Sequence, residues 1–328
     1  MRLLQLRTLS NLLPNYKENR IMNSTASMVA DLRKKTGCGM MECKKALVEA
    51  EGNVDEAIKV LRERGLAVAA KKAERIAADG VVDIKTTGNT TAMIEVNSET
   101  DFVAKNENFR AFVVTLLDTI IANKPADVDA LLASKYLDTE MTVADKMQEM
   151  VFTIGEKLDI RRFVVVDGTV STYIHGKGSI GVIVTFDADE TAKNNEGFAE
   201  FAKNIALQVG AYPTSYLDRD SVPASVVEEE KNVLIAQIKN DPANSKKPDA
   251  IIEKMVIGRI GKFYENNCLC EQAYVKDDSM KVCQYVDKTA KEFGGAIKLT
   301  GFFRFEKGEG IQKREENFAD EISKMVNK

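Results

Sequence analysis

The sequence has little histidine, tryptophan or cysteine, and these shortages exclude several kinds of site. Its 328 residues include one histidine, His175, no tryptophan and five cysteines. A histidine-rich metal site is excluded, and a histidine-dependent catalytic triad could use only His175. The P-loop, nucleophile-elbow and H-E-x-x-H motifs are absent as well. The chain is therefore predicted not to be an enzyme and to need no metal or cofactor.

The cysteines indicate a reduced protein. They stand at positions 38, 43, 268, 270 and 283, without any C-x-x-C pair. A zinc site would need four close nitrogen or sulfur ligands, and a disulfide-stapled domain would be denser in cysteine. We therefore predict free, mostly buried thiols.

The charge balance and the hydrophobic pattern narrow the partners. Lys and Arg number 46 against 50 Asp and Glu, so the net charge is −4, whereas nucleic-acid-binding domains usually carry a basic excess. No apolar run reaches the ~18 residues that span a bilayer. We predict no direct nucleic-acid partner and no membrane association. The length favours about two domains plus a small module.

Residues 1–24 are predicted to be a disordered extension. Met1–Ile21 contains four basic residues, Glu18 as its only acid, and several leucines that could share one face. This composition weakly resembles an organellar transit peptide. The interpretation we favour is a dispensable extension with Met22 as an alternative start. The expected location is accordingly the cytoplasm, or an organellar matrix if residues 1–21 are a transit peptide.

Residues 25–66 are predicted to form a three-helix, ubiquitin-associated-like docking module. The first helix has Thr25 or Ser27 as candidate N-caps and ends at 36–39, the second ends at Gly52, and the third starts at Asn53 and ends at Gly65. Helices this short must pack together to be stable. Residues 67–80 are rich in helix formers and are predicted to be a helical linker.

The rest of the chain predicts an α+β core of two related subdomains. Subdomain 1, residues 81–160, contains a hairpin of strands 81–87 and 90–97 and helices over 109–120 and 143–158. Subdomain 2, residues 161–220 and 270–307, contains strands 163–167, 171–175, 180–186 and 296–306 and a helix over 198–209. A glycine, an apolar strand, an acidic loop and a helix follow one another in both, which indicates a duplicated plan.

Two further helical elements complete the predicted fold. Residues 221–269 are expected to insert an antiparallel helical hairpin, with Val227, Leu234 and Ile238 facing Ile252, Met255 and Val256 across a polar turn. Residues 308–328 are expected to form a C-terminal module whose helix places Phe318, Ile322, Met325 and Val326 on one face.

The segment Thr100–Asn106, TDFVAKN, is the most informative loop because it joins a predicted strand to a long helix. In a purely structural interpretation, Thr100 or Asp101 caps the helix and Phe102 folds onto the core. In a functional interpretation, Asp101 and Phe102 project into a partner. The residue pattern alone favours the structural interpretation.

Several segments, in order, resemble the elongation factor Ts family of translation. TDFVAKN with the preceding EVNSE resembles the signature of this family. KKTGCGMMECKKALVEAEGNVDEAIKVLRERG resembles its N-terminal module and IHGKGSIGVIV a strand pair of its second subdomain. EKMVIGRIGKFYENNCLCEQAYVKD and FFRFEKGEGIQKREENFADEISK resemble its helical region and its C-terminus. The resemblance covers nearly all of residues 25–328.

This resemblance implies a guanine-nucleotide exchange factor for elongation factor Tu. The chain would bind elongation factor Tu in the GDP-bound and the nucleotide-free form. By matching position, Thr100, Asp101, Phe102 and Val103 would disturb the Mg²⁺ site of the partner. His175 and Gly176 would support them from the second subdomain. The alternative function is a translation-associated scaffold without exchange activity. Self-association through the helical hairpin is a further expectation.

Overall fold

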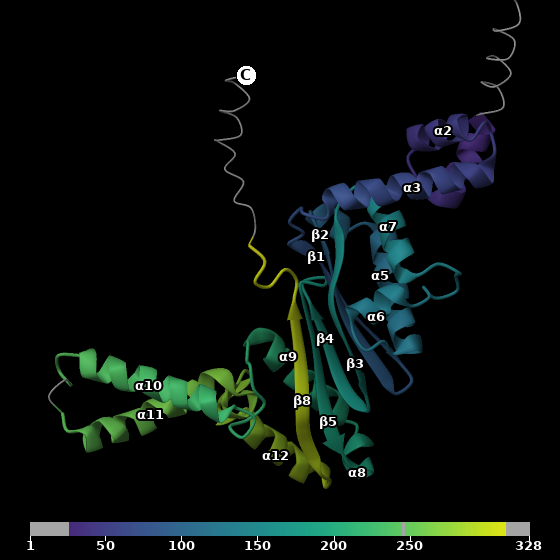
Figure 1. Ribbon diagram of the computed structural model, residues 1–328. Coiled ribbons are helices and arrows are strands. Elements are labelled where there is room, and N and C mark those ends of the chain that lie inside the picture. Colours follow the sequence, from purple (N-terminus) through teal and green to yellow (C-terminus); the bar gives the residue numbers. More distant parts are fainter. Residues whose placement is uncertain (1–25, 245–246, 313–328) are drawn as a thin grey trace, which may run out of the picture.

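Three helices form a separate module at the N-terminal end of the computed structural model, which describes residues 26–244 and 247–312 (Figure 1). Helix 26–36, α2 (Met40–Glu49) and α3 (Val54–Lys72) pack around a small apolar core. The side chain of Asn53 accepts hydrogen bonds from the backbone N–H groups of Asp55 and Glu56, at 3.0 and 3.3 Å. The predicted three-helix module and its Asn53 cap are therefore confirmed.

The third helix extends beyond Gly65, where the sequence pattern predicts its end. Helix α3 continues through Gly65 to Lys72, so the predicted linker begins as part of this helix. The residues after Gly65 are strong helix formers, and they outweigh the roughly 1 kcal/mol that one glycine costs in a helix. Gly65 is buried, and a β-carbon there would lie 3.5 Å from Phe152 of α7 (Val143–Ile154), so the small residue lets α3 approach α7 closely.

The first half of the core is a three-stranded antiparallel sheet covered by helices. Its strands are β1 (Asp79–Thr87), β2 (Thr90–Ser98) and β3 (Leu158–Asp167), in the order β1-β2-β3. Between β2 and β3 lie α4 (Asp101–Ala104), α5 (Glu107–Asn123), α6 (Val128–Ala133) and α7 (Val143–Ile154). The predicted hairpin and both predicted helices of this half are confirmed.

The strand predicted at 163–167 belongs to this first sheet, not to the second subdomain. It begins five residues earlier, at Leu158, because α7 stops at Gly155 in a left-handed conformation. The chain then returns beside β2, and Ile94 pairs with Phe163. This pairing joins residues far apart in sequence, so local periodicity could not reveal it.

The second half repeats the order of the first half. Strands β4 (Thr169–His175) and β5 (Ile180–Ala188) form a hairpin, followed by α8 (Glu190–Lys193) and α9 (Phe198–Ala211). The third strand, β8 (Ile297–Glu306), completes the order β4-β5-β8. In both halves a hairpin, a short helix, a long helix and a third strand follow one another. The predicted pair of related α+β subdomains is therefore confirmed.

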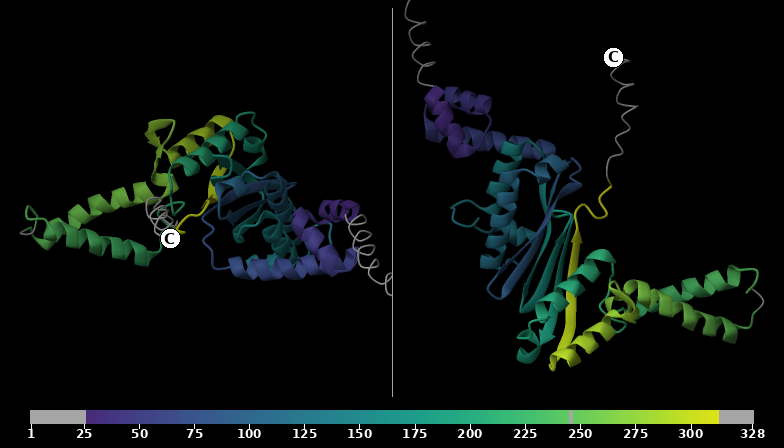
Figure 2. Two further views of the ribbon diagram at one scale, coloured as in Figure 1. Left: turned by 90° about the horizontal axis from the view of Figure 1, so that it is seen from above. Right: turned by 180° about the vertical axis from the view of Figure 1, so that it is seen from behind.

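The two sheets lie between outer layers of helices (Figures 1 and 2). Val82 and Met93 of the first sheet share an apolar cluster with Ile183 and Phe305 of the second. The opposite face of the first sheet carries the core beneath α5 and α7, and that of the second sheet carries the core beneath α9 and α12 (Val282–Phe293). The two sheets therefore share one apolar interface at the centre of the core.

A helical hairpin projects from the second half (Figure 1). It consists of α10 (Ala224–Asn240) and α11 (Asp249–Asn267), followed by η1 (Leu269–Glu271), β6 (Ala273–Tyr274) and β7 (Asp277–Lys281). Leu234, Ile238, Ile252 and Val256 are buried between its helices, with Met255 packed beside them. These contacts confirm the predicted hairpin. Val227 is half-buried and lies outside this cluster.

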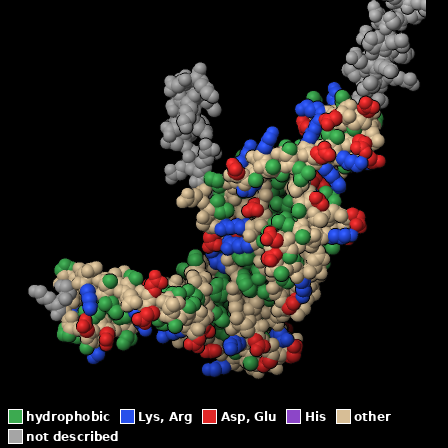
Figure 3. Space-filling view, in the orientation of Figure 1, with side chains coloured by type: hydrophobic (Ala, Val, Ile, Leu, Met, Phe, Trp, Pro, Cys, Tyr) green, Lys and Arg blue, Asp and Glu red, His purple; other side chains and the backbone are tan. Residues whose placement is uncertain are grey.

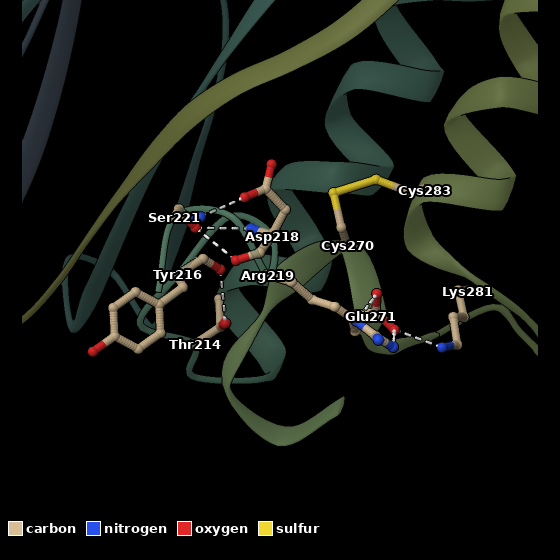
Figure 4. Close-up of a disulfide and its surroundings, with 9 residues drawn as sticks. All are labelled: Thr214, Tyr216, Asp218, Arg219, Ser221, Cys270, Glu271, Lys281 and Cys283. Atoms are coloured by element: carbon tan, nitrogen blue, oxygen red, sulfur yellow. Dashed lines mark hydrogen bonds and ion pairs between the residues drawn. A yellow bond between two sulfur atoms is a disulfide. The ribbon is translucent and has the colours of Figure 1, made fainter. Parts of the chain in front are cut away.

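The prediction that all five cysteines are reduced is wrong, because Cys270 and Cys283 form a disulfide (Figure 4). Their Cα atoms lie 4.7 Å apart, since the β6–β7 hairpin brings η1 back against the start of α12. Cys38, Cys43 and Cys268 are free and buried, as predicted. The bridge ties the base of the helical hairpin to the second subdomain.

An ion cluster lies beside this disulfide (Figure 4). Arg219 donates from Nε and Nη2 to the two carboxylate oxygens of Glu271, at 2.7 and 2.9 Å, and Lys281 donates to the same carboxylate at 2.6 Å. The hydrogen bonds from Arg219 are the main reason that the pKa of Glu271 falls from 4.5 to about 2, although burial opposes the shift. The carboxylate therefore stays ionised to low pH in the folded protein.

Glu271 is expected to stabilise the fold in a pH-dependent way. Because its pKa is lower in the folded than in the unfolded chain, its contribution is complete above about pH 5 and is lost as the pH falls from about 4.5 toward 2. Urea unfolding of Glu271→Gln and the unmodified chain should give free energies whose difference is constant at pH 6 to 7 and narrows toward pH 3. A difference that does not change with pH would contradict this role.

Two predicted parts lie outside the described residues. They are the extension 1–24 and the tail helix with Phe318, Ile322, Met325 and Val326; the N-cap candidate Thr25 is also outside. In the described part of the chain, every helix is too short or too polar to cross a lipid bilayer.

Candidate partner-binding site

The loop after β2 presents Phe102 to solvent and buries its neighbour. Helix α4 is a single turn, because the side chain of Asn106 caps α5 immediately afterwards by accepting from the N–H groups of Asn108 and Phe109. The ring of Phe102 is 79% exposed, whereas Val103 is 8% exposed and joins the core beneath α5. The structural interpretation in which Phe102 folds onto the core is therefore wrong. Val103 is the residue that anchors the loop.

Neither Thr100 nor Asp101 caps the long helix. Thr100 has an extended backbone and makes no capping bond to α4. Its N–H and Oγ1 groups donate instead to the carboxylate oxygens of Glu156, at 3.0 and 2.7 Å. The Oγ group of Ser98 donates to the carbonyl oxygen of Thr100 at 2.9 Å. Glu156 lies between α7 and β3, so its hydrogen bonds fix the start of the loop to a segment that is distant in sequence.

Two opposite charges flank the exposed ring. Asp101 forms an ion pair with Lys105 one helical turn later, and the Lys105 ammonium lies 6.0 Å from the centre of the Phe102 ring. The hydrogen bond from Lys105 is the main reason that the pKa of Asp101 is below its ordinary value. The loop thus offers a partner one aromatic ring, one carboxylate and one ammonium group.

The β4–β5 turn carries the second predicted site. His175 and Gly176 are exposed, and the His175 Nδ1 atom lies 2.8 Å from the Tyr173 hydroxyl group in a hydrogen bond. The turn is seated on the first half of the core, because the Val82 N–H group donates to the Gly178 carbonyl oxygen at 2.8 Å. The structure therefore places His175 on a supported turn, in an accessible position.

The two predicted sites are linked through one side chain. Arg110, on α5, donates to the carbonyl oxygen of Ala104, at the end of α4, and to that of Lys177, in the β4–β5 turn. Residues from the two halves of the core are thereby brought to the same region.

The sequence matches a known protein family over most of its length. The sequence model of the family described as "Elongation factor TS" matches residues 99–309, a range that contains both predicted sites. The chain belongs to the elongation factor Ts family.

Close relatives cover the chain almost completely. A protein named "Elongation factor Ts" from Syntrophotalea carbinolica is 45% identical over 309 residues, which are 93% of this chain and 100% of the relative. One with the same name from Magnetococcus marinus is 46% identical over 308 residues, 93% of this chain and 99% of the relative. Membership of the elongation factor Ts family implies a role in protein biosynthesis, in nucleotide exchange on elongation factor Tu.

Two residues that fix the predicted loops, Glu156 and Arg110, have no local signal in the sequence. Glu156 looked like the polar end of a helix, and Arg110 interrupts no pattern on α5. Their partners, Thr100 and Lys177, lie 56 and 67 residues away in sequence, so nothing local signalled either contact.

No group of three or more His, Cys, Asp or Glu side chains that could hold a metal ion occurs within residues 26–244 and 247–312.

Proposed function

We propose that the chain is a guanine-nucleotide exchange factor that binds elongation factor Tu in its GDP-bound and nucleotide-free forms. Asp101 and Phe102 enter the partner beside its Mg²⁺ and phosphate site, and GDP leaves without any covalent chemistry. The observation that carries this proposal is the 79% exposed ring of Phe102 on a loop whose next residue is buried. A large exposed apolar group on a fixed backbone is typical of an interface anchor.

The mechanism follows from differential binding. A GTPase holds GDP through phosphate contacts and Mg²⁺, so a factor that binds the nucleotide-free form better than the loaded form promotes release. The carboxylate of Asp101 and the ring of Phe102 suit this task, because a negative charge and an apolar group both disfavour a neighbouring phosphate. His175 and Gly176 support the contact from the second half of the core.

The energetics require a broad interface. Accelerating release by about 10³-fold takes about 4 kcal/mol. Burying one phenylalanine ring contributes about 2 to 3 kcal/mol, so Phe102 needs help from other contacts. The N-terminal module supports this, because Met40 and Met41 on α2 are 58% and 61% exposed. In the proposal this module docks on the nucleotide-binding domain of elongation factor Tu, and the second half of the core docks on another domain.

The surface favours a protein partner over nucleic acid. Acidic and basic side chains are interspersed on the face in Figure 3, along both the N-terminal module and the helical hairpin. A nucleic-acid-binding surface would gather basic groups. The proposal therefore includes no direct nucleic-acid contact, and it places the activity in the cytoplasm, where translation elongation takes place.

Release of a fluorescent GDP analogue from elongation factor Tu tests this function. In a stopped-flow experiment with excess unlabelled GDP, the chain is expected to accelerate release by about 10³-fold, within the range that several kcal/mol of differential binding allow. A heat-denatured sample of the chain is the control. Binding without acceleration would favour the alternative of a scaffold and would contradict the proposal.

A further inference from the structure

Arg110 makes an unusual pair of contacts for a half-buried arginine. Its Nε donates to the carbonyl oxygen of Ala104 at 2.7 Å, and its Nη2 donates to that of Lys177 at 2.5 Å. Both acceptors are backbone atoms, and no described carboxylate forms an ion pair with its guanidinium group. A planar guanidinium that bonds two fixed carbonyl groups sets their separation.

The first acceptor belongs to the helix that carries Phe102. Ala104 is the last residue of α4, and its carbonyl oxygen is one of those that a helix end leaves without an intrahelical partner. A cation at this end is favourable for the helix dipole as well. Because α4 has only four residues, a bond at its last carbonyl group also restrains Phe102, two residues earlier.

The second acceptor belongs to a strained turn. Gly176, Lys177 and Gly178 all have positive φ angles, of 57°, 58° and 101°. For a lysine this conformation is uncommon and must be held by the surroundings. Gly178 is pressed against β1, where a β-carbon would lie 2.3 Å from the side chain of Val81. Arg110 holds the lysine carbonyl group between this anchored glycine and His175.

We propose that Arg110 is a positioning residue that holds the Phe102 helix and the His175 turn in one arrangement for the partner. The inference rests on the proposed function, since it concerns the same site. Phe102 and His175 come from different halves of the core, so their relative position depends on contacts between the halves. A bridge that fixes them in advance lowers the ordering cost of reaching the state that releases GDP.

The test replaces the bridge and measures exchange. Arg110→Met keeps much of the apolar stem, and Arg110→Lys keeps the charge but not the fork of donors. Lys135→Met, which removes an exposed cation that pairs with Glu140 in the first half of the core, is the matched control. The stimulated GDP release rate is measured against concentration of each variant, which separates the maximal rate from the half-saturating concentration.

Arg110→Met is expected to lower the maximal release rate about fivefold while the half-saturating concentration changes less than about twofold, because it affects the releasing state more than docking. Arg110→Lys should lie between Arg110→Met and the unmodified chain, and Lys135→Met should match the unmodified chain. A variant that only destabilised the fold would lower the melting temperature without this split. An unchanged maximal rate for Arg110→Met would overturn the inference.

A double variant separates the inference from the proposed function. If Arg110 acts through Phe102, adding Arg110→Met to Phe102→Ala should cause little further loss; a full additional fivefold loss would overturn the inference. If Phe102→Ala alone stimulates GDP release normally, the proposed role of Phe102 fails, and amide hydrogen exchange still tests the bridge. Arg110→Met should speed amide exchange in both 100–106 and 175–178, and unchanged exchange in either segment would overturn it.

Discussion

Phe102→Ala is expected to slow stimulated GDP release about tenfold or more, because truncating an interface anchor costs about 2 kcal/mol. The ring is 79% exposed in the free chain, so its removal takes away no packing from the core. The folded chain should therefore be as stable as before, and the loss should appear only when elongation factor Tu is present. Stopped-flow release of a fluorescent GDP analogue measures the effect.

The control for this prediction is Val114→Ala. Val114 is also an exposed apolar residue of the first half of the core, on α5, and its truncation should leave the release rate within about twofold, as is usual for surface substitutions. Unfolding of both variants in urea checks that each is folded. An unchanged release rate for a folded Phe102→Ala variant would remove Phe102 from the mechanism.

Much of the secondary structure could be predicted from local pattern. The helix over 109–120 repeats apolar residues at helical spacing, and the structure buries Phe109, Phe112 and Leu116 at those positions. The strand at 296–306 is likewise predicted to complete the second sheet, and the structure places it there, beside β5. The residues that define each of these elements lie within about ten positions of one another, so a local sequence pattern is enough to predict the element.

Long-range pairing was harder to predict. The sequence pattern places strand β3 in the wrong half, because its partner in β2 lies about seventy residues earlier and its own pattern suits either sheet. The Cys270–Cys283 disulfide has no motif spacing and depends on the short β6–β7 hairpin. In both cases the deciding contact forms only when the chain has folded.

The position of the candidate site could be predicted from the sequence, but the orientation of its side chains could not. Periodicity marked the loop 100–106 as an interruption, but it could not decide which of Phe102 and Val103 turns inward, because adjacent residues on one helical turn differ by only about 100° in direction. The preference for a buried Phe102 followed the general tendency of large aromatic rings. Family resemblance favoured the exposed orientation, and the structure has it.

A second large effect is expected at Glu95, a fully buried carboxylate on β2 that joins the two halves of the core. Its two oxygens accept from Arg161 at 3.0 Å and from Arg162 at 2.7 Å, and Oε1 also accepts from the N–H group of Gly308 at 2.8 Å. Gly308 follows β8, so the carboxylate fixes the chain leaving the second sheet onto the first. The next residue back, Lys307, donates its N–H to Ser179 beside the His175 turn, at 2.9 Å.

Glu95→Ala is expected to lower the free energy of unfolding by about 3 kcal/mol, because removing one partner of a buried ion cluster leaves the others without compensation. Arg161 and Arg162 keep 26% and 31% of their side-chain surface exposed, so water offsets part of the loss. Glu140→Ala is the control, since the ion pair of Glu140 with Lys135 is exposed and should contribute less than about 1 kcal/mol. Urea unfolding at pH 7 measures both, and amide exchange at Gly308 should rise only in Glu95→Ala. Equal stability of the two variants would mean that the carboxylate does not hold the halves together.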